Sequence, residues 1–69
     1  MKYFKMIDLK DLQIGDVLFF RSKYSPSGRH VGVYIGNDQF FHAANYKRGV
    51  ITSCLDNYYD ILIGVGRLD

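Results

Sequence analysis

The stretch His30-Val-Gly-Val-Tyr-Ile-Gly-Asn-Asp-Gln-Phe-Phe-His-Ala-Ala44 decides the fold of this chain. Apolar residues alternate with glycine and tyrosine over positions 30–36, which is the two-residue period of a half-buried β-strand. Asn37-Asp38 favours a tight turn because both residues tolerate positive φ, and positions 39–44 supply the return strand. The stretch therefore predicts a β-hairpin that carries His30 and His42, the two histidines of the chain, near its ends.

The rest of the chain continues this pattern of short strands and turns. Segments rich in apolar, β-branched and aromatic residues are separated by turns containing glycine, proline, asparagine or aspartate. Strands are expected over residues 16–21, 30–36, 39–44, 50–55 and 61–68, and single helical turns near 7–13 and 56–60. The predicted fold is mainly β: a five-stranded antiparallel sheet, curled or closed into a small barrel, with residues 1–7 as an N-terminal extension.

Size and composition limit the class of protein. With 69 residues, 48% of them hydrophobic, the chain is expected to form one small domain with a core. The net charge of +2 is too small for the dense basic face of a nucleic-acid-binding protein, so no nucleic-acid partner is expected. No apolar run approaches the ~20 residues of a membrane span or the roughly 7–15 residues of a signal-peptide core. The residues themselves therefore leave the localisation open.

Four segments together resemble the second half of an NlpC-family domain, and NlpC-family proteins are papain-like cysteine peptidases of the bacterial cell wall. The segments are Leu12–Phe20, Gly28–Asn37, Phe40–Ala44 and Gly49–Ser53, and the resemblance runs from about residue 8 to the C-terminus. It implies the C-terminal, histidine-bearing β half of a papain-like α+β fold, without the N-terminal helices. It also implies a place in the bacterial envelope or outside the cell.

The resemblance also implies roles for the two histidines. His30 matches the family's catalytic base, and His42 matches the polar residue that orients this base. The family's nucleophile lies upstream, in an Asp-Cys-Ser-Gly motif at the start of a helix, and no cysteine precedes His30 in this sequence. Because the thiolate is the group that attacks the amide carbonyl, we expect the 69 residues alone to be inactive.

Two residues near the hairpin are candidates for substrate binding. Tyr34, on the same strand as His30, either lines a substrate groove or covers the sheet. Arg29, with Arg21 and Lys23, flanks the first loop. These cations either meet carboxylates of an acidic stem peptide of peptidoglycan or form a solvated loop rim.

The remaining cysteine and the possibility of a metal are weaker candidates. Cys54 is the one cysteine, so the chain has no disulfide, and it follows both histidines. We expect it to be a small packing residue rather than a substitute nucleophile. Two histidines are too few ligands for a zinc site, so neither a metal nor another cofactor is expected.

Sheet geometry sets a condition on the histidine pair. If Asn37-Asp38 is a strict two-residue loop, Val33 faces His42, and the rings of His30 and His42 lie on opposite faces, because directly opposed residues share a face. One extra residue in the hairpin moves both rings to the same face. A catalytic pair therefore requires an irregular hairpin.

Three functions are compatible with these residues. One is hydrolysis of an amide bond in peptidoglycan stem peptides, with the nucleophile supplied from outside these residues. Another is a non-catalytic module that binds a wall peptide or a protein. A small nucleic-acid- or peptide-binding barrel is the weakest alternative, because the basic excess is slight.

A sheet that lacks its helices exposes apolar surface, and such patches mark interfaces. We therefore expect this chain either to dock on a chain that supplies the helical half or to form a homodimer. The expected contact is the face around Val31, Val33 and Ile35, or the opposite face.

Overall fold

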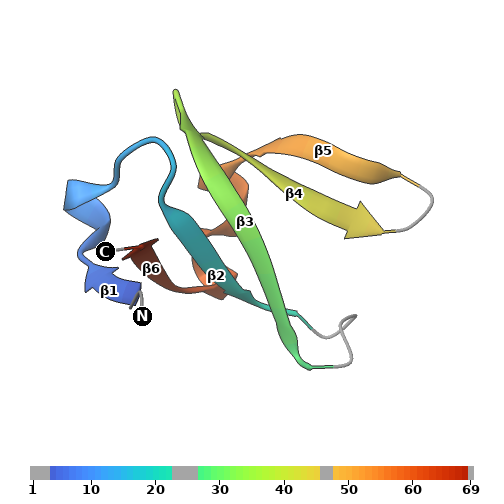
Figure 1. Ribbon diagram of the computed structural model, residues 1–69. Coiled ribbons are helices and arrows are strands. Elements are labelled where there is room, and N and C mark those ends of the chain that lie inside the picture. Colours follow the sequence, from blue (N-terminus) through green and yellow to red (C-terminus); the bar gives the residue numbers. More distant parts are fainter. Residues whose placement is uncertain (1–3, 23–26, 46–47, 69) are drawn as a thin grey trace.

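The computed structural model describes residues 4–22, 27–45 and 48–68, and its elements follow the order shown in Figure 1. The strands are β1 (Phe4–Ile7), β2 (Val17–Arg21), β3 (Arg29–Gly36), β4 (Gln39–Asn45), β5 (Gly49–Cys54) and β6 (Leu62–Leu68). Two short 3-10 helices, η1 (Leu9–Asp11) and η2 (Leu55–Ile61), stand where the helical turns were predicted. In the described part of the chain, no helix has the length and apolar character needed to cross a membrane.

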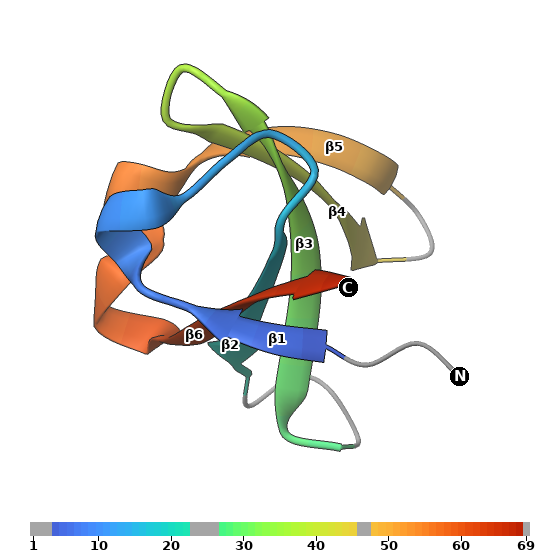
Figure 2. The ribbon, with the colours of Figure 1, turned by 60° about the vertical axis from the view of Figure 1, so that its left-hand side comes forward.

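All six strands belong to one antiparallel sheet. Their order is β1-β6-β2-β3-β4-β5, so β1 and β5 are its two edges. The sheet curls strongly but does not close, because these edges do not pair with each other (Figure 2). The predicted mainly β, antiparallel, curled sheet is confirmed. The sheet is open, so the alternative of a closed barrel is wrong.

The structure contains one strand more than the five predicted. Strand β1 lies within residues 1–7, which the sequence suggested only as an N-terminal extension, and it pairs along β6 from Phe4↔Leu68 to Ile7↔Val65. The segment itself alternates weakly, with lysines between its apolar residues. Backbone hydrogen bonds to the neighbouring strand β6 therefore stabilise the extended conformation of this segment more than its own sequence does.

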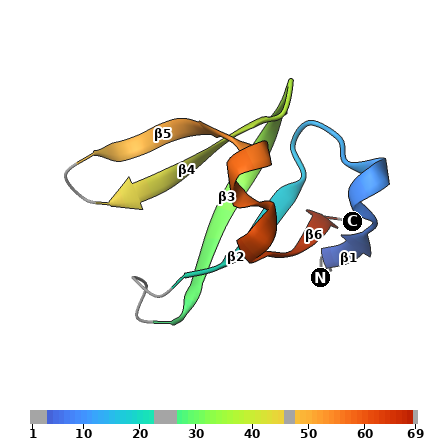
Figure 3. The same cartoon turned by 180° about the vertical axis from the view of Figure 1, so that it is seen from behind.

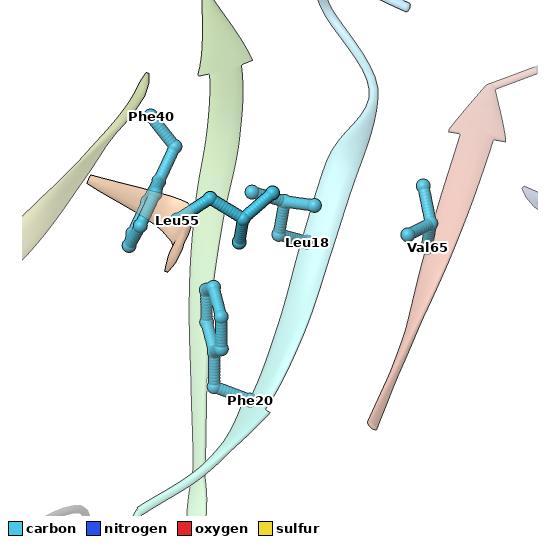
Figure 4. Packing of buried hydrophobic residues seen from close by; sticks show 5 residues of the cluster. All are labelled: Leu18, Phe20, Phe40, Leu55 and Val65. Atoms are coloured by element: carbon cyan, nitrogen blue, oxygen red, sulfur yellow. The ribbon is translucent and has the colours of Figure 1, made fainter. Parts of the chain in front are cut away.

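The core lies on one face of the sheet, which we call the inner face. Its buried hydrophobic side chains come from β2, β4, β6 and the start of η2: Leu18, Phe20, Phe40, Leu55 and Val65 (Figure 4). Helix η2 connects β5 to β6 and covers this face (Figure 3). The ring of Tyr58, in η2, lies 5.6 Å from that of Phe20 and 5.2 Å from that of Phe40 between centroids.

The opposite face, which we call the outer face, carries apolar side chains that remain about half exposed. Val31, on β3, is 50% exposed, and Phe41, on β4, is 40% exposed. Phe4, Met6 and Val50 extend this exposed apolar surface along the edge strands. The two faces follow from the two-residue period of the strands, which sends successive side chains to opposite sides.

An ion pair between a buried aspartate and a partly exposed arginine joins the residue before β2 to β6. Asp16 is 2% exposed, and its two carboxylate oxygens lie 2.7 and 2.8 Å from Nε and Nη2 of Arg67. The backbone N–H of Gln13 donates to the same carboxylate over 2.9 Å. The hydrogen bond from Arg67 is the main reason why the pKa of Asp16 lies below its usual value. This pair fixes the turn before β2, which in turn contacts the hairpin.

Candidate active site

The β3–β4 hairpin contains one extra residue. Tyr34 pairs with Phe40 and Gly36 pairs with Gln39, so Ile35 is a bulge that has no partner on β4. The turn itself is the predicted one, with φ of 53° at Asn37 and 62° at Asp38. This is the irregularity that the two histidines were expected to need.

The bulge brings the two histidines to the same face. Gly32 lies directly opposite His42, so His30, two residues earlier on β3, is a diagonal neighbour of His42 on the inner face. Nε2 of His30 lies 2.6 Å from Nδ1 of His42, and the two rings meet edge to face at 86°. The expectation that an irregular hairpin lets the rings touch is confirmed.

The two rings of this histidine pair lie at different depths. His42 is 6% exposed, and its ring lies 4.8 Å from that of Phe40 and 5.9 Å from that of Tyr58. His30 is only partly buried. Nε2 of His30 contacts His42, whereas Nδ1 of His30 makes no hydrogen bond within residues 4–22, 27–45 and 48–68.

A serine continues the pair on the next strand. Ser53, on β5, lies opposite Phe40, while His42 lies opposite Ile51, so Ser53 is the diagonal neighbour of His42 on the side away from His30. Its Oγ lies 2.9 Å from Nε2 of His42. We call the resulting series His30–His42–Ser53 the histidine row. The row runs obliquely across β3, β4 and β5. His42, the buried residue at its centre, has a hydrogen-bond partner on each of its two ring nitrogens.

Electrostatics favour the neutral form of the buried ring. Burial lowers the pKa of His42, and electrostatic interactions with His30 and Arg48 lower this pKa further. A neutral imidazole has one N–H and one lone pair, so it can pass a hydrogen bond from one neighbour to the next. In its neutral form His42 can therefore accept a hydrogen bond on one ring nitrogen and donate one from the other.

Tyr34 shares the inner face with the histidine pair, but it braces the hairpin. It lies four residues from His30 along β3, which is about 13 Å. Its ring packs against the buried core, and its hydroxyl accepts a hydrogen bond of 3.1 Å from the backbone N–H of Asp38 in the turn. A contact between Tyr34 and substrate stays a prediction.

Arg29 is not brought to the histidine pair. It is exposed at the first position of β3 and pairs with Arg21, so the strand alternation places it on the outer face while His30 is on the inner face. Lys23, the third cation named with them, lies outside the described residues. A contact between Arg29 and substrate also stays a prediction.

Cys54 is exposed, so the expectation that it is a packing residue is wrong. It pairs with Gln39 on the face that also carries Thr52 and Phe41, whereas the adjacent Ser53 points to the histidines. A thiol on the outer face cannot reach Nδ1 of His30 across the sheet. The described residues also contain no group of three or more potential metal ligands.

Ser53 is the site residue that the sequence did not single out. The expected strand over residues 50–55 alternates, so it does place Ser53 on the same face as Ile51. Only the pairing of β5 with β4 shows that this face is the one that carries His42. The alternation of the strand predicts the face on which Ser53 lies, but its contact with His42 depends on the register between β5 and β4, which the sequence does not reveal.

Known proteins match this sequence. The model of the NlpC/P60 family matches residues 1–63. A "Probable endopeptidase" of Haemophilus influenzae is 40% identical over 57 residues, which cover 83% of this chain and 35% of that protein. The "Probable endopeptidase NlpC" of Escherichia coli is 47% identical over 53 residues, covering 77% of this chain and 34% of that protein.

A third relative has a more specific name. The "Murein DD-endopeptidase MepS/Murein LD-carboxypeptidase" of Escherichia coli is 44% identical over 55 residues, which cover 80% of this chain and 28% of that protein. The chain thus spans about a third of the length of the curated relatives it matches.

Proposed function

The chain belongs to the NlpC/P60 family, and we propose that its histidine pair is the base half of a cysteine endopeptidase site. The proposed reaction is hydrolysis of an amide bond in a stem peptide of peptidoglycan. The names of the relatives support this class of substrate, since they refer to endopeptidases and, for one of them, to murein. The proposed place of action is the bacterial envelope or the outside of the cell.

The observation that carries the proposal is the contact between His30 and His42. A general base needs an accessible nitrogen and a partner that fixes its ring. His30 has both: its Nε2 is held 2.6 Å from a buried imidazole, and its Nδ1 remains available.

The proposed reaction uses a thiol from outside these residues. Nδ1 of His30 takes the proton of that thiol, and the thiolate attacks the carbonyl carbon of the amide. The proton on Nδ1 then passes to the leaving amine as the C–N bond breaks, which leaves an acyl-enzyme thioester. A water molecule gives a proton to Nδ1 and attacks the carbonyl carbon of this thioester; the C–S bond breaks, the carboxylic acid leaves, and the proton on Nδ1 returns to the thiolate.

The source of the thiol can be tested by reconstitution. The chain is joined at its N-terminus to a helical segment that carries the family's Asp-Cys-Ser-Gly motif, and release of peptides from isolated peptidoglycan is measured. We expect turnover by the joined protein and none by the 69 residues alone. His30→Ala in the joined protein is expected to lower kcat by about 10²–10⁴-fold, the usual contribution of a general base.

The controls separate this site from other sources of activity. Replacing the cysteine of the supplied motif by alanine should abolish turnover, whereas Cys54→Ala should leave it unchanged, because Cys54 lies on the outer face. Full activity of the His30→Ala protein would contradict the proposal. Turnover by the isolated chain that depends on His30 would contradict the assignment of the nucleophile to another segment.

The second candidate is a module that binds a wall peptide or a protein without cutting it. Cys54 is the one cysteine in the sequence and does not face the histidines. Binding of purified stem peptides by the isolated chain, together with no turnover in the joined protein, would favour this candidate over the peptidase.

A further inference from the structure

We infer that Ser53 is a positioning residue, which stabilises the tautomer of His42 that makes His30 a base at its accessible nitrogen. This inference rests on the proposed function, because it takes His30 as the general base. It starts from the 2.9 Å contact between Oγ of Ser53 and Nε2 of His42. Ser53 does not touch the reacting atoms; it acts through His42.

The position of one proton on His42 decides what His30 can do. If Nδ1 of His42 carries the proton, it donates to Nε2 of His30, and a neutral His30 must then carry its own proton on Nδ1. His30 cannot accept a proton from a thiol in that state. If Nε2 of His42 carries the proton, Nδ1 of His42 accepts from Nε2–H of His30, and Nδ1 of His30 holds a lone pair.

Ser53 supplies the acceptor that the second arrangement needs. With the proton on Nε2 of His42, this N–H points at Oγ of Ser53, which accepts the hydrogen bond. Among the described residues, Ser53 is the hydrogen-bond partner of Nε2, and the rings of Phe40 and Tyr58 surround His42. Without the hydroxyl this N–H would be buried without an acceptor, which is costly.

The tautomer of His42 with its proton on Nε2 also stabilises the cationic form of His30. After His30 has taken the thiol proton, both of its nitrogens carry hydrogens, so Nε2–H still needs an acceptor. Nδ1 of His42 is that acceptor only while the proton of His42 stays on Nε2. Ser53 therefore lets the histidine row keep one arrangement through the proton transfer, and such preorganisation lowers the cost of reorganisation during the reaction.

A matched pair of substitutions isolates the hydroxyl. Ser53→Thr keeps the hydroxyl and Ser53→Val has a methyl group in its place on a side chain of the same shape as threonine, and both residues favour a strand. Thr52→Ala is the control, since it removes a hydroxyl from the adjacent residue on the outer face. Two measurements are made: imidazole ¹⁵N chemical shifts of the 69-residue chain, and the pH profile of kcat for the joined protein.

We expect the native chain and Ser53→Thr to show His42 protonated on Nε2. Ser53→Val is expected to lose this single tautomer and to lower kcat roughly tenfold with little change in KM, the rate equivalent of one hydrogen bond. Thr52→Ala should match the native protein in both measurements. An unchanged tautomer and unchanged kcat in Ser53→Val would overturn the inference.

The outcomes for Ser53 and for His30 are distinguishable. If His30→Ala abolishes activity but Ser53→Val leaves both the tautomer and kcat unchanged, the inference fails and the proposed function stands. If His30→Ala is fully active, the proposed function fails. Covalent labelling of Ser53 by a fluorophosphonate would make Ser53 a nucleophile with His42 as its base, which would also overturn its assignment as a positioning residue.

Discussion

The inner and outer faces of the sheet are made from alternating residues of the same strands, yet they have different characters. On β4, Phe40 and His42 are buried on the inner face, while Phe41 remains 40% exposed on the outer face. On β5, Ser53 reaches His42 and the adjacent Cys54 is exposed on the other side. The comparison shows that strand register, more than residue type, decides which polar group can take part in chemistry.

The largest expected difference between the faces is the cost of removing a phenylalanine. Phe40 is 0% exposed and Phe41 is 40% exposed, although they are neighbours on β4. We expect Phe40→Ala to lower the free energy of unfolding by about 3–5 kcal/mol, because it leaves a cavity beside His42. Phe41→Ala should cost about 1 kcal/mol or less. Urea unfolding of the two variants measures both values, and equal losses would contradict the assignment of the faces.

Glycines on the two faces give a second, smaller difference. A Cβ on Gly32, opposite His42, would lie 2.6 Å from Cδ2 of the buried Phe40, whereas one on Gly64 would lie 2.9 Å from the flexible end of Met6. We expect Gly32→Ala to cost roughly 1–3 kcal/mol by overpacking and to displace the ring on which His42 packs. Gly64→Ala should cost about 0.5 kcal/mol or less, since Met6 is exposed and can move. An unchanged free energy of unfolding in Gly32→Ala would show that the inner face can accommodate a methyl group beside Phe40.

Acid should weaken the inner face through His42. Its pKa in the folded chain is lowered, mainly by burial, so below the unfolded value of about 6.5 the unfolded chain binds more protons. This contribution to stability is complete above that value and falls as the pH drops, by at most about 1.4 kcal/mol per pH unit for one proton. Urea unfolding between about pH 7.5 and pH 5 should show the loss, and His42→Gln should reduce it. An equally steep loss in His42→Gln would assign it to other groups.

The outer face should matter for association rather than for stability. Its exposed apolar residues include Val31, which is 50% exposed. We predict that the isolated chain self-associates at high concentration and that Val31→Asp weakens this association while changing the free energy of unfolding by about 0.5 kcal/mol or less. Leu9→Asp, in η1 and outside the sheet, is the control. Sedimentation of the native chain as a monodisperse monomer at high concentration would contradict the prediction.

Most of the fold could be predicted from local patterns. The five expected strands and both helical turns appear within a residue or two of their predicted bounds, because period-two alternation and turn residues are local signals. Strand β1 could not be found in this way, since its pairing with β6 joins residues at opposite ends of the chain. The loop at residues 22–29 and the turn at 46–49 lie partly outside the described residues.

The candidate site was predictable only in part. The residues indicated that His30 and His42 could meet if the hairpin were irregular, but not that Ile35 would be the bulge. The bulge lies beside Tyr34, whose backbone N–H donates to the carbonyl of Asp16 and whose carbonyl accepts from Gly15. Contacts between residues so far apart in sequence are set by tertiary structure, which is also why the pairing of Ser53 with His42 could not be foreseen.

The hydrogen bond between the two histidines is the centre of this account, and one measurement tests it directly. In the ¹⁵N-labelled chain at neutral pH, a scalar coupling across the hydrogen bond is predicted between Nε2 of His30 and Nδ1 of His42, which lie 2.6 Å apart. Absence of this coupling would contradict a hydrogen bond between the two rings, which requires about 3 Å between these nitrogens.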